Sequence, residues 1–471
     1  MSKIFNSITT TAVVLGLCMA GNAFATNGYF THGNGTKNKA MAGSGIALPE
    51  DSIDVTNNPA VAPFVGDQLI VGAALFSPIR KYQTGDSMFQ GNFGAFTIGP
   101  NNIKSKSNYF VIPHIAKSWQ MDNGMAWALS FYGRGGMNTD WNGGTATFDP
   151  DGPGPAGPMT FDGTYGDALF GGSGKAGVNL SQAFLDVTWA KKFSDRASIG
   201  ISGVLVAQYF KANGVRTFAQ YTETFARSQN PMMPDMPTSL SNNGTDWAYG
   251  AGLKFGFHSQ ISDALSFGIM YQTKINMSEF DDYSDLFAEQ GDFDIPADLK
   301  VGLTLKATDN VALNFDIEHI WYSDVGAVGN PIQNVFACPS AGQGGTLFEN
   351  CLGGDNGAGF GWDDMTVYKA GMRWKTGEDW TWRFGYSYGE QPIPSSQMTF
   401  NILAPATIES HITAGFTLER TPGRQFNMSF LYAPNKKISG PQNFDGPPNL
   451  AQTVTMEMYQ WEMEASYSWR F

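Results

Sequence analysis

The chain ends on YQWEMEASYSWRF, residues 459–471, a stretch that alternates strictly between apolar and polar side chains. A period of two is typical of a β-strand whose two faces lie in different environments. Two Trp and two Tyr share the apolar face. A strand of a soluble sandwich seldom carries so many large rings there, whereas Trp and Tyr suit a lipid–water boundary. The stretch therefore predicts a membrane-spanning strand.

The same alternation recurs upstream, for example in residues 311–318 and 380–388, where every charged side chain falls on the face opposite the apolar one. A Lys or Arg turned toward lipid costs roughly 2–4 kcal/mol near the midplane of the bilayer. The charges are therefore expected to face a polar, wet interior.

Marking each such run predicts an all-β fold, a 14-stranded antiparallel transmembrane β-barrel. An even number is what bacterial single-chain barrels have, with turns at one end and long loops at the other. The expected strands are 68–77, 107–119, 124–133, 180–193, 196–210, 246–259, 262–277, 297–307, 310–322, 364–376, 379–388, 410–419, 424–433 and 456–471.

Residues 1–25 have the form of a secretory signal peptide, with Lys3 near the start, an apolar stretch, and Ala23-Phe24-Ala25 before the expected cleavage point. The mature chain would then begin at Thr26. In an exported chain, Cys338 and Cys351 form an even pair within a short Gly-rich segment, which favours a loop disulfide over two free thiols.

The net charge of −13 and the absence of a basic run exclude nucleic acid as an expected partner. The segment GGSGKAG lacks the spacing of a phosphate-binding loop, and no G-x-S-x-G motif is present. The five His are scattered without metal-ligand spacing. We therefore expect no enzyme activity, no metal and no cofactor.

Residues 26–67 precede the first strand and lack its alternation. Such a segment can hang as a tail or fold into the lumen as a plug, and its Gly, Asn and Ala content suits packing inside a polar lumen. The remaining residues, 68–471, form the expected barrel. Pro113 lies inside a predicted strand, where proline cannot donate to the ladder; both a tolerated bulge and a gap in the wall remain open.

Several motifs in order resemble one family. They are NGYFTHGNGTKNKAMAGSGIALPEDS followed by NNPA and VGAALFSP near the start, and later SFYGRGGMNTDW, LFAEQGDFDIPA, GWDDMTVYKAGM and GYSYGEQPIPSS. Across the mature chain they resemble the FadL-type outer-membrane transporters of long-chain fatty acids and other hydrophobic compounds. The plug of that family carries an Asn-Pro-Ala motif, which here is Asn58-Pro59-Ala60.

The resemblance implies uptake through the Gram-negative outer membrane. A hydrophobic ligand would bind in an apolar groove among the outer loops, pass to a site inside the barrel, and leave when the plug shifts. Exit in that family is sideways, at a kinked early strand that the Asn-Pro-Ala segment contacts. Pro113 lies near that place, but the third expected strand has no interior proline.

Ligand capture requires apolar surface, which the loops supply with little charge and with adaptable Met side chains. The groove candidates are Phe218, Phe225, Met232, Met233, Met236, Leu286 and Phe287. A small core buried by the loops themselves is the alternative. A ligand carboxylate would need a cation on the inward face, and Arg could bind it bidentately. The candidates are Lys300, Lys369, Arg373 and Arg383.

Three alternatives remain beside fatty-acid uptake: a channel for aromatic hydrocarbons, an open porin for small polar solutes, and a surface adhesin. The expected partners are a hydrophobic small molecule, lipid and lipopolysaccharide of the outer membrane, and the barrel assembly machinery, because the terminal Phe471 resembles its recognition signal. We expect a monomer.

Overall fold

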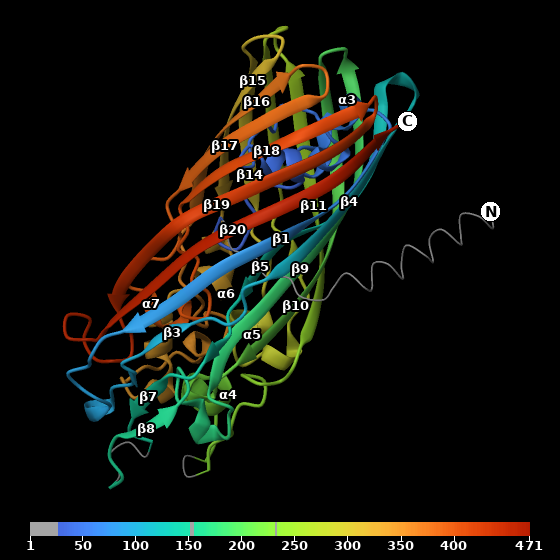
Figure 1. Cartoon of the computed structure of the whole chain (residues 1–471). Helices are drawn as coiled ribbons and strands as arrows, with labels where there is room; N and C mark the ends of the chain where they lie inside the picture. The colour runs from blue at the N-terminus through green and yellow to red at the C-terminus, as the bar shows by residue number, and fades with distance from the viewer. Residues whose placement is uncertain (1–26, 151–154, 231–232) are drawn as a thin grey trace.

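The computed structural model describes residues 27–150, 155–230 and 233–471, and in these residues a closed antiparallel barrel of 14 strands dominates (Figure 1). The last strand pairs with the first from Gln68↔Arg470 to Thr84↔Val454, which closes the cylinder. The barrel strands are β1 (Gln68–Thr84), β4 (Phe110–Gln120), β5 (Met125–Asn138), β9 (Lys175–Ser194), β10 (Ala197–Asn213), β11 (Asp246–Gln260), β12 (Leu265–Gln272), β14 (Asp298–Lys306), β15 (Val311–Ile320), β16 (Met365–Thr376), β17 (Trp380–Gly389), β18 (Ser410–Thr421), β19 (Arg424–Pro441) and β20 (Thr453–Arg470).

Short elements occupy the loops and the lumen. The short strands are β2 (Thr97–Ile98), β3 (Asn102–Lys104), β6 (Trp141–Asn142), β7 (Thr145–Phe148), β8 (Met159–Asp162) and β13 (Asn276–Met277). The α-helical turns are α2 (Thr36–Lys39), α3 (Ala62–Val65), α4 (Glu223–Ala226), α5 (Ala288–Gly291), α6 (Gly326–Gly329) and α7 (Met398–Asn401). The 3-10 turns are η1 (Ser52–Thr56), η2 (Pro59–Val61), η3 (Asn92–Gly94), η4 (Asp122–Gly124), η5 (Asp167–Phe170), η6 (Arg216–Tyr221), η7 (Asp281–Tyr283), η8 (Tyr322–Asp324), η9 (Ile332–Ala337), η10 (Pro339–Ala341) and η11 (Phe348–Asn350).

The predicted barrel is confirmed, and each expected strand corresponds to an observed one. The strand expected at 262–277 is shorter than predicted, because β12 ends at Gln272 and the chain resumes pairing only in β13. There the Thr273 hydroxyl accepts a hydrogen bond from the Leu253 amide, which interrupts the regular ladder. Side-chain hydroxyls compete with backbone partners in this way without changing the apolar alternation that sequence reasoning uses.

The two faces of the wall follow the predicted parity. On β20, Glu462 and Glu464 are buried, whereas Tyr459 and Met463 are exposed on the outer surface. Rings also gather on the outside of β17 and β18, where Trp380 stacks on Trp382 at 5.5 Å. The wall is therefore apolar outside and polar inside, as a membrane barrel requires.

Residues 27–67, which we call the lumen segment, run inside the barrel and appear blue within the cylinder in Figure 1. Nearly all of them are buried. Their hydrogen bonds reach strands on every side of the wall, such as Thr36 to Glu464, Ile46 to Asp316 and Ala42 to Thr413. No helix among the described residues is long and apolar enough to cross a membrane.

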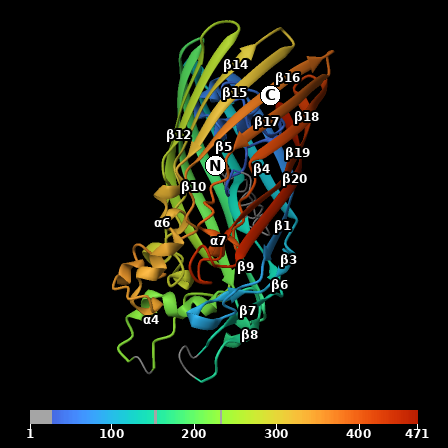
Figure 2. The same cartoon turned by 90° about the vertical axis from the view of Figure 1, so that its left-hand side faces the viewer.

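The two ends of the barrel differ (Figure 2). One end, the turn end, carries short connections such as η4 between β4 and β5. At the other end, the loop end, the small sheet β2-β7-β8 and the helical turns α4, α6 and α7 cover the mouth. The described core is therefore concentrated in the lumen and under these loops.

Candidate functional site

An apolar cavity lies beneath the loops at the loop end. Its lining is almost entirely carbon and includes Phe210 from β10, Phe218 from η6 and Phe400 from α7. The other lining residues are Val178, Val215, Leu286, Phe287, Ala327, Leu352, Ala358, Gly359, Phe360 and Leu403. Its free volume is about 30 Å³, which is too small for a fatty-acid chain. A hydrophobic ligand can enter only if these side chains separate.

Aromatic rings continue from this cavity toward the start of the lumen segment. Tyr29 contacts Phe30, Tyr322, Trp362 and Phe293, with ring centroids 5.1–6.1 Å apart. Phe293 in turn contacts Phe287 of the cavity at 5.0 Å. Apolar surface is thus continuous from the loops to the first described residues of the chain.

The structure brings together three of the predicted groove residues. Phe218, Leu286 and Phe287 line the cavity. Phe225 is only half-buried and is not part of the lining, and Met233 and Met236 are exposed on the surface of the same loop. Met232 lies outside the described residues.

Sequence reasoning missed other members of the lining, namely Phe210, Phe360, Phe400 and Leu403. Phe210 belongs to β10, Phe360 to the loop before β16, and Phe400 and Leu403 to the loop between β17 and β18, and low charge alone did not distinguish them. Phe210 sits at the end of β10, where the alternation already predicted an inward face. Extending the inward–outward alternation of β10 beyond the membrane boundary would have identified Phe210 as an inward-facing residue.

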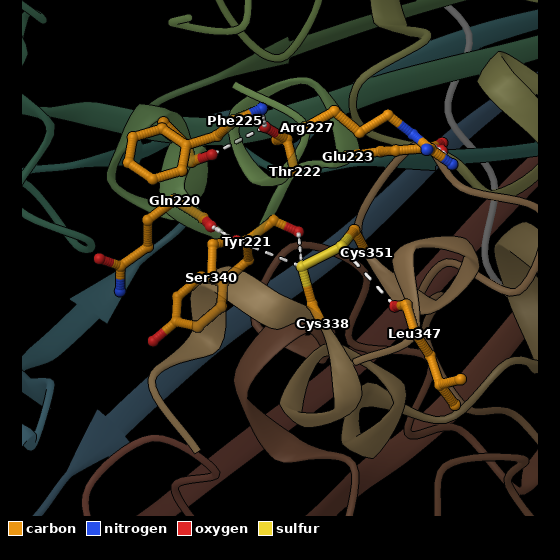
Figure 3. The surroundings of a disulfide bond; sticks show 11 residues. Gln220, Tyr221, Thr222, Glu223, Phe225, Arg227, Cys338, Ser340, Leu347 and Cys351 are labelled. Carbon is orange, nitrogen blue, oxygen red and sulfur yellow. Dashed lines mark hydrogen bonds and ion pairs between the residues drawn. A yellow bond between two sulfur atoms is a disulfide. The ribbon is translucent and has the colours of Figure 1, made fainter. Parts of the chain in front are cut away.

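A disulfide joins Cys338 to Cys351 beside the cavity, with an S–S distance of 2.04 Å (Figure 3). The neighbouring Leu352 lines the cavity, and its amide donates to the Tyr221 carbonyl at 2.8 Å. Cys338 Sγ lies 3.7 Å from the same carbonyl. The crosslinked segment is therefore tied to the chain around η6, which carries Phe218.

A second loop feature borders the aromatic rings. Burial, together with the charge of nearby Asp294, raises the pKa of Asp292 to about 7. Asp294 is held by Lys274 at 2.7 Å and by the Met277 amide. Phe293 follows Asp292 directly in the chain, so the charge of Asp292 lies next to this ring.

The four predicted carboxylate-binding cations are all paired with acids. Lys300 and Lys369 both contact Glu318, at 3.0 and 2.6 Å. Arg383 donates two hydrogen bonds to Glu50 of the lumen segment, and Arg373 lies 3.7 Å from the same carboxylate. Lys369 also donates to the His32 carbonyl. These residues hold the lumen segment and one another.

Further ion pairs anchor the lumen segment nearer the turn end. Lys39 contacts both Glu462 and Glu464 within 2.9 Å, and Lys37 contacts Asp51 at 2.9 Å. All of these side chains are buried. A buried charge that loses its partner is strongly destabilising, so this part of the segment is held firmly.

Asn58, Pro59 and Ala60 lie near the turn end against β10 and β11. The Asn58 side chain caps η2 by accepting from the Ala60 amide and donates to the carbonyls of Ile46 and Phe257. A Cβ at Gly200 or Gly256 would stand 2.6–2.8 Å from the Ala60 amide nitrogen. Glycine at both wall positions therefore permits this close approach.

The resemblance led us to expect the Asn-Pro-Ala segment at a kinked early strand, and the structure differs. Among the early strands β5 is irregular, because its pairing with β9 shifts between Gly133 and Gly135. Its edge is met by the start of the lumen segment instead, because Thr31 donates to the Arg134 carbonyl and Gly136 to the Tyr29 carbonyl. The irregularity occurs at glycines and not at a proline. The Gly-Arg-Gly-Gly run of residues 133–136 inside a strand is the sequence feature that indicates a bulge.

Pro113 lies where β4 separates from β5. The ladder between them starts at His114↔Tyr132, whereas the ladder of β4 with β1 continues to Phe110. We call residues 110–113 and 133–138, which lie beyond the end of the β4–β5 ladder, the seam. The side chain of the bulged Arg134 points inward and contacts Asp298 at 2.7 Å. Pro113 is thus the residue at which the wall ladder stops.

Comparison with known proteins agrees with this geometry. The model of the family described as Outer membrane protein transport protein (OMPP1/FadL/TodX) matches residues 152–471. The chain belongs to this family. The expected location in the Gram-negative outer membrane is thereby confirmed, as is the expectation of a transport protein.

Individual relatives are distant in sequence. A long-chain fatty acid transport protein of Salmonella typhi is 20% identical over 90% of each chain. A solved FadL homologue of Pseudomonas aeruginosa superposes with a TM-score of 0.62 at 14% identity, covering 94% of this chain and 100% of that one. The toluene transporter TodX of Pseudomonas putida gives 0.59 at 16% identity, covering 94% and 99%. At these identities the structures support the fold.

Proposed function

We propose that this protein takes up hydrophobic small molecules, most specifically long-chain fatty acids, across the outer membrane. The observation that carries the proposal is the continuous apolar surface from the loop-end cavity to the rings around Tyr29 and Trp362. An open porin would instead need a wet channel. The chain's similarity to a curated fatty acid transport protein supports the same substrate class.

Entry begins at the loop end, which faces outward. Phe218, Leu286 and Phe287 form the first tight apolar contact for the ligand, while Phe225, Met232, Met233 and Met236 belong to the loop that ligand meets before it. Transfer of apolar surface from water into this cavity drives binding, at roughly 25 cal/mol per Å². The cavity opens by repacking of its side chains.

Exit is sideways, at the seam. Residues 27–31 lie against the edge of β5 where β4 is absent, so a small shift of these residues exposes the seam to the ligand. Residues 36–60 are anchored by buried ion pairs and by η2, including Asn58, Pro59 and Ala60. In this mechanism residues 26–67 act as a plug. Its start, residues 27–31 beside the seam, acts as the gate, and its anchored part, residues 36–60, stays in place.

Uptake of labelled oleate in a strain lacking its own transporter tests the proposal. Cells that carry this chain should accumulate oleate well above the empty-vector level. Entry of an aromatic hydrocarbon with oleate at the vector level would reject the fatty-acid assignment and keep the apolar route. No entry of either, with a correctly folded barrel, would reject hydrophobic uptake.

Two further interactions belong to the proposal. Phe471 is exposed at the chain end, with its ring under the Lys117 ammonium at 4.0 Å, and it serves as the signal for the barrel assembly machinery. The apolar outer wall contacts membrane lipid and lipopolysaccharide, and the barrel is complete as a monomer.

A further inference from the structure

Lysine side chains gather on the outer surface of the barrel near the loop end. The strands β3, β1, β20 and β19 lie side by side there (Figure 1). Lys104 of β3 stands opposite Lys81 of β1. Glu457 of β20 stands opposite Lys81 on one side and Lys437 of β19 on the other. With Lys106, which follows β3, the three lysines form a group that we call the cation patch.

The burial of neighbouring residues shows which way the patch faces. Tyr82 and Met456, which adjoin Lys81 and Glu457 in the chain, are fully buried. Because successive side chains of a strand point to opposite faces, Lys81 and Glu457 face outward. The other three members of the patch are exposed. The cation patch is therefore part of the outer surface of the wall.

The cation patch lies just beyond the apolar band of the wall. On the side toward the turn end, Tyr109, Tyr432 and Trp461 face outward, and the rings of Tyr109 and Trp461 are 6.3 Å apart. From Trp469 at the turn end to Glu457, the strand rises roughly 30 Å along the barrel axis at the usual tilt, whereas the apolar band of such barrels is roughly 25 Å tall. The patch is therefore level with the lipid head groups at the loop end.

The charge of the patch is opposite to that of the whole chain, which has 42 acidic residues against 29 Lys and Arg. Glu457 contacts Lys437 at 2.9 Å and Lys81 at 3.6 Å. Neither Lys104 nor Lys106 has an ion-pair partner among the residues that the structure describes. Like charges directly opposite each other destabilise a ladder, so the pairing of Lys81 with Lys104 does not serve the stability of the sheet.

We propose that the cation patch binds a phosphate of lipopolysaccharide, the phosphorylated glycolipid of the outer leaflet, while the acyl chains of that lipid lie on the rings of Tyr109 and Trp461. The inference rests on the proposed contact with lipopolysaccharide and assigns a site to it. Ammonium groups bind phosphate through charge-assisted hydrogen bonds. A phosphate between Lys81 and Lys104 removes the repulsion of their ammonium groups, so binding stabilises the pairing of β1 with β3.

The test measures the affinity of the purified full-length protein for lipid A, the phosphorylated anchor of lipopolysaccharide, and for dephosphorylated lipid A. The wild type should bind the phosphorylated form about tenfold more tightly or better. K81Q/K104Q should weaken its binding by about tenfold, because each lysine near an anionic head group contributes to affinity. Binding of the dephosphorylated form should change less than twofold. The matched control K306Q/K375Q removes two exposed lysines at the turn end and should change neither affinity.

E457Q separates lipid binding from a purely structural role of the ion pairs. Without its carboxylate, Glu457 no longer competes with phosphate for Lys81 and Lys437, so lipid A should bind about threefold more tightly. If the lysines only brace the sheet, E457Q lowers the thermal stability of the barrel and leaves lipid A affinity unchanged or weaker. That result would overturn the proposal.

Three other results would also overturn it. They are equal affinity of the wild type for the two forms of lipid A, wild-type affinity in K81Q/K104Q, and an equal loss in the turn-end control, since charge anywhere on the barrel would then suffice. If K81Q/K104Q fails to assemble, K437Q serves instead. A loss of about threefold for lipid A alone is expected for K437Q, and no loss rejects the site.

The proposed uptake function fails separately. K81Q/K104Q should take up labelled oleate at the wild-type rate, because the cation patch lies outside the barrel. A wild type that binds lipid A through the patch but carries no oleate rejects fatty-acid uptake and keeps the lipid site. A wild type that carries oleate but does not distinguish the two forms of lipid A rejects the lipid site alone.

Discussion

The lumen segment is held by two kinds of force along its length. From Thr36 to Ala60, buried ion pairs and backbone hydrogen bonds fix it to the wall, as Lys39 with Glu462 and Glu50 with Arg383 illustrate. Around Tyr29 and Phe30, rings from the loops surround it. Ion pairs in a dry interior are specific in geometry, whereas apolar contacts are non-directional and can re-form around a ligand. In the proposed mechanism the first region closes the pore, and the second conducts the ligand.

The largest expected effect tests the closing role. Deleting residues 27–66 should raise the steady conductance of the barrel in planar bilayers by about 100-fold, because a polar lumen of this size fills with water. The full-length chain should conduct little under the same conditions. High conductance of the full-length chain would instead favour an open porin.

A single substitution in the anchored region should show a smaller effect. E50Q leaves the buried Arg383 without its carboxylate, which costs roughly 3–5 kcal/mol. Hydrogen exchange should then speed up in residues 36–60, and leak conductance should rise, while apolar uptake is retained. E223Q is the control, because its partner Arg227 is exposed and such pairs contribute little. Protection unchanged by E50Q would contradict the anchoring.

A substitution in the apolar region should lower ligand uptake without raising the leak conductance. F218S removes a ring that lines the cavity and contacts Phe400 at 5.1 Å. Uptake of a hydrophobic ligand should fall by about tenfold, since a buried aromatic side chain contributes roughly 1.5–3 kcal/mol. Conductance should stay low. F93S, at an exposed position, should leave both quantities unchanged.

The smallest effect concerns pH. The pKa of Asp292 is raised to about 7, mainly by burial, above the value near 4 of an unfolded Asp. The structured loop therefore binds more protons than the unfolded loop, and its stability falls as pH rises from about 4 through 7. Ligand binding should weaken a few-fold over this range. D292N should make ligand affinity independent of pH over this range. An unchanged dependence of affinity on pH in D292N would show that Asp292 does not control it.

Much of the barrel could be predicted because the bilayer imposes a period of two on every strand. Val311 to Ile317 and Trp380 to Tyr388 followed that rule without regard to their neighbours. The cavity lining was predicted only in part, because Phe360 and Phe400 come from loops whose packing depends on long-range contacts. Inward parity found Arg383 and Lys369 but could not reveal that Glu50 and Glu318 neutralise them.

The seam could likewise be predicted only in part from the sequence. Pro113 marked the place where a ladder bond is missing, yet the sequence did not show that β5 bulges at Arg134 without proline. Nor did the position of Asn58 in the motif indicate that β10 and β11, through Gly200 and Gly256, would receive it. Such pairings depend on which distant glycines face the lumen, and alternation alone carries no information about them.

The most direct test of the division between a closing region and a conducting region is to crosslink the closing region covalently to the barrel wall and measure uptake. A Cβ at Gly371 on the wall would lie 2.2 Å from the Ser44 Oγ, so the pair S44C/G371C brings two thiols together at this contact; mass spectrometry identifies the molecules in which oxidation has formed the disulfide. With the crosslink formed, cells should take up labelled oleate at the wild-type rate. The ligand leaves at the seam, which the crosslinked residues do not cover. Uptake reduced to the empty-vector level by the crosslink would contradict the account.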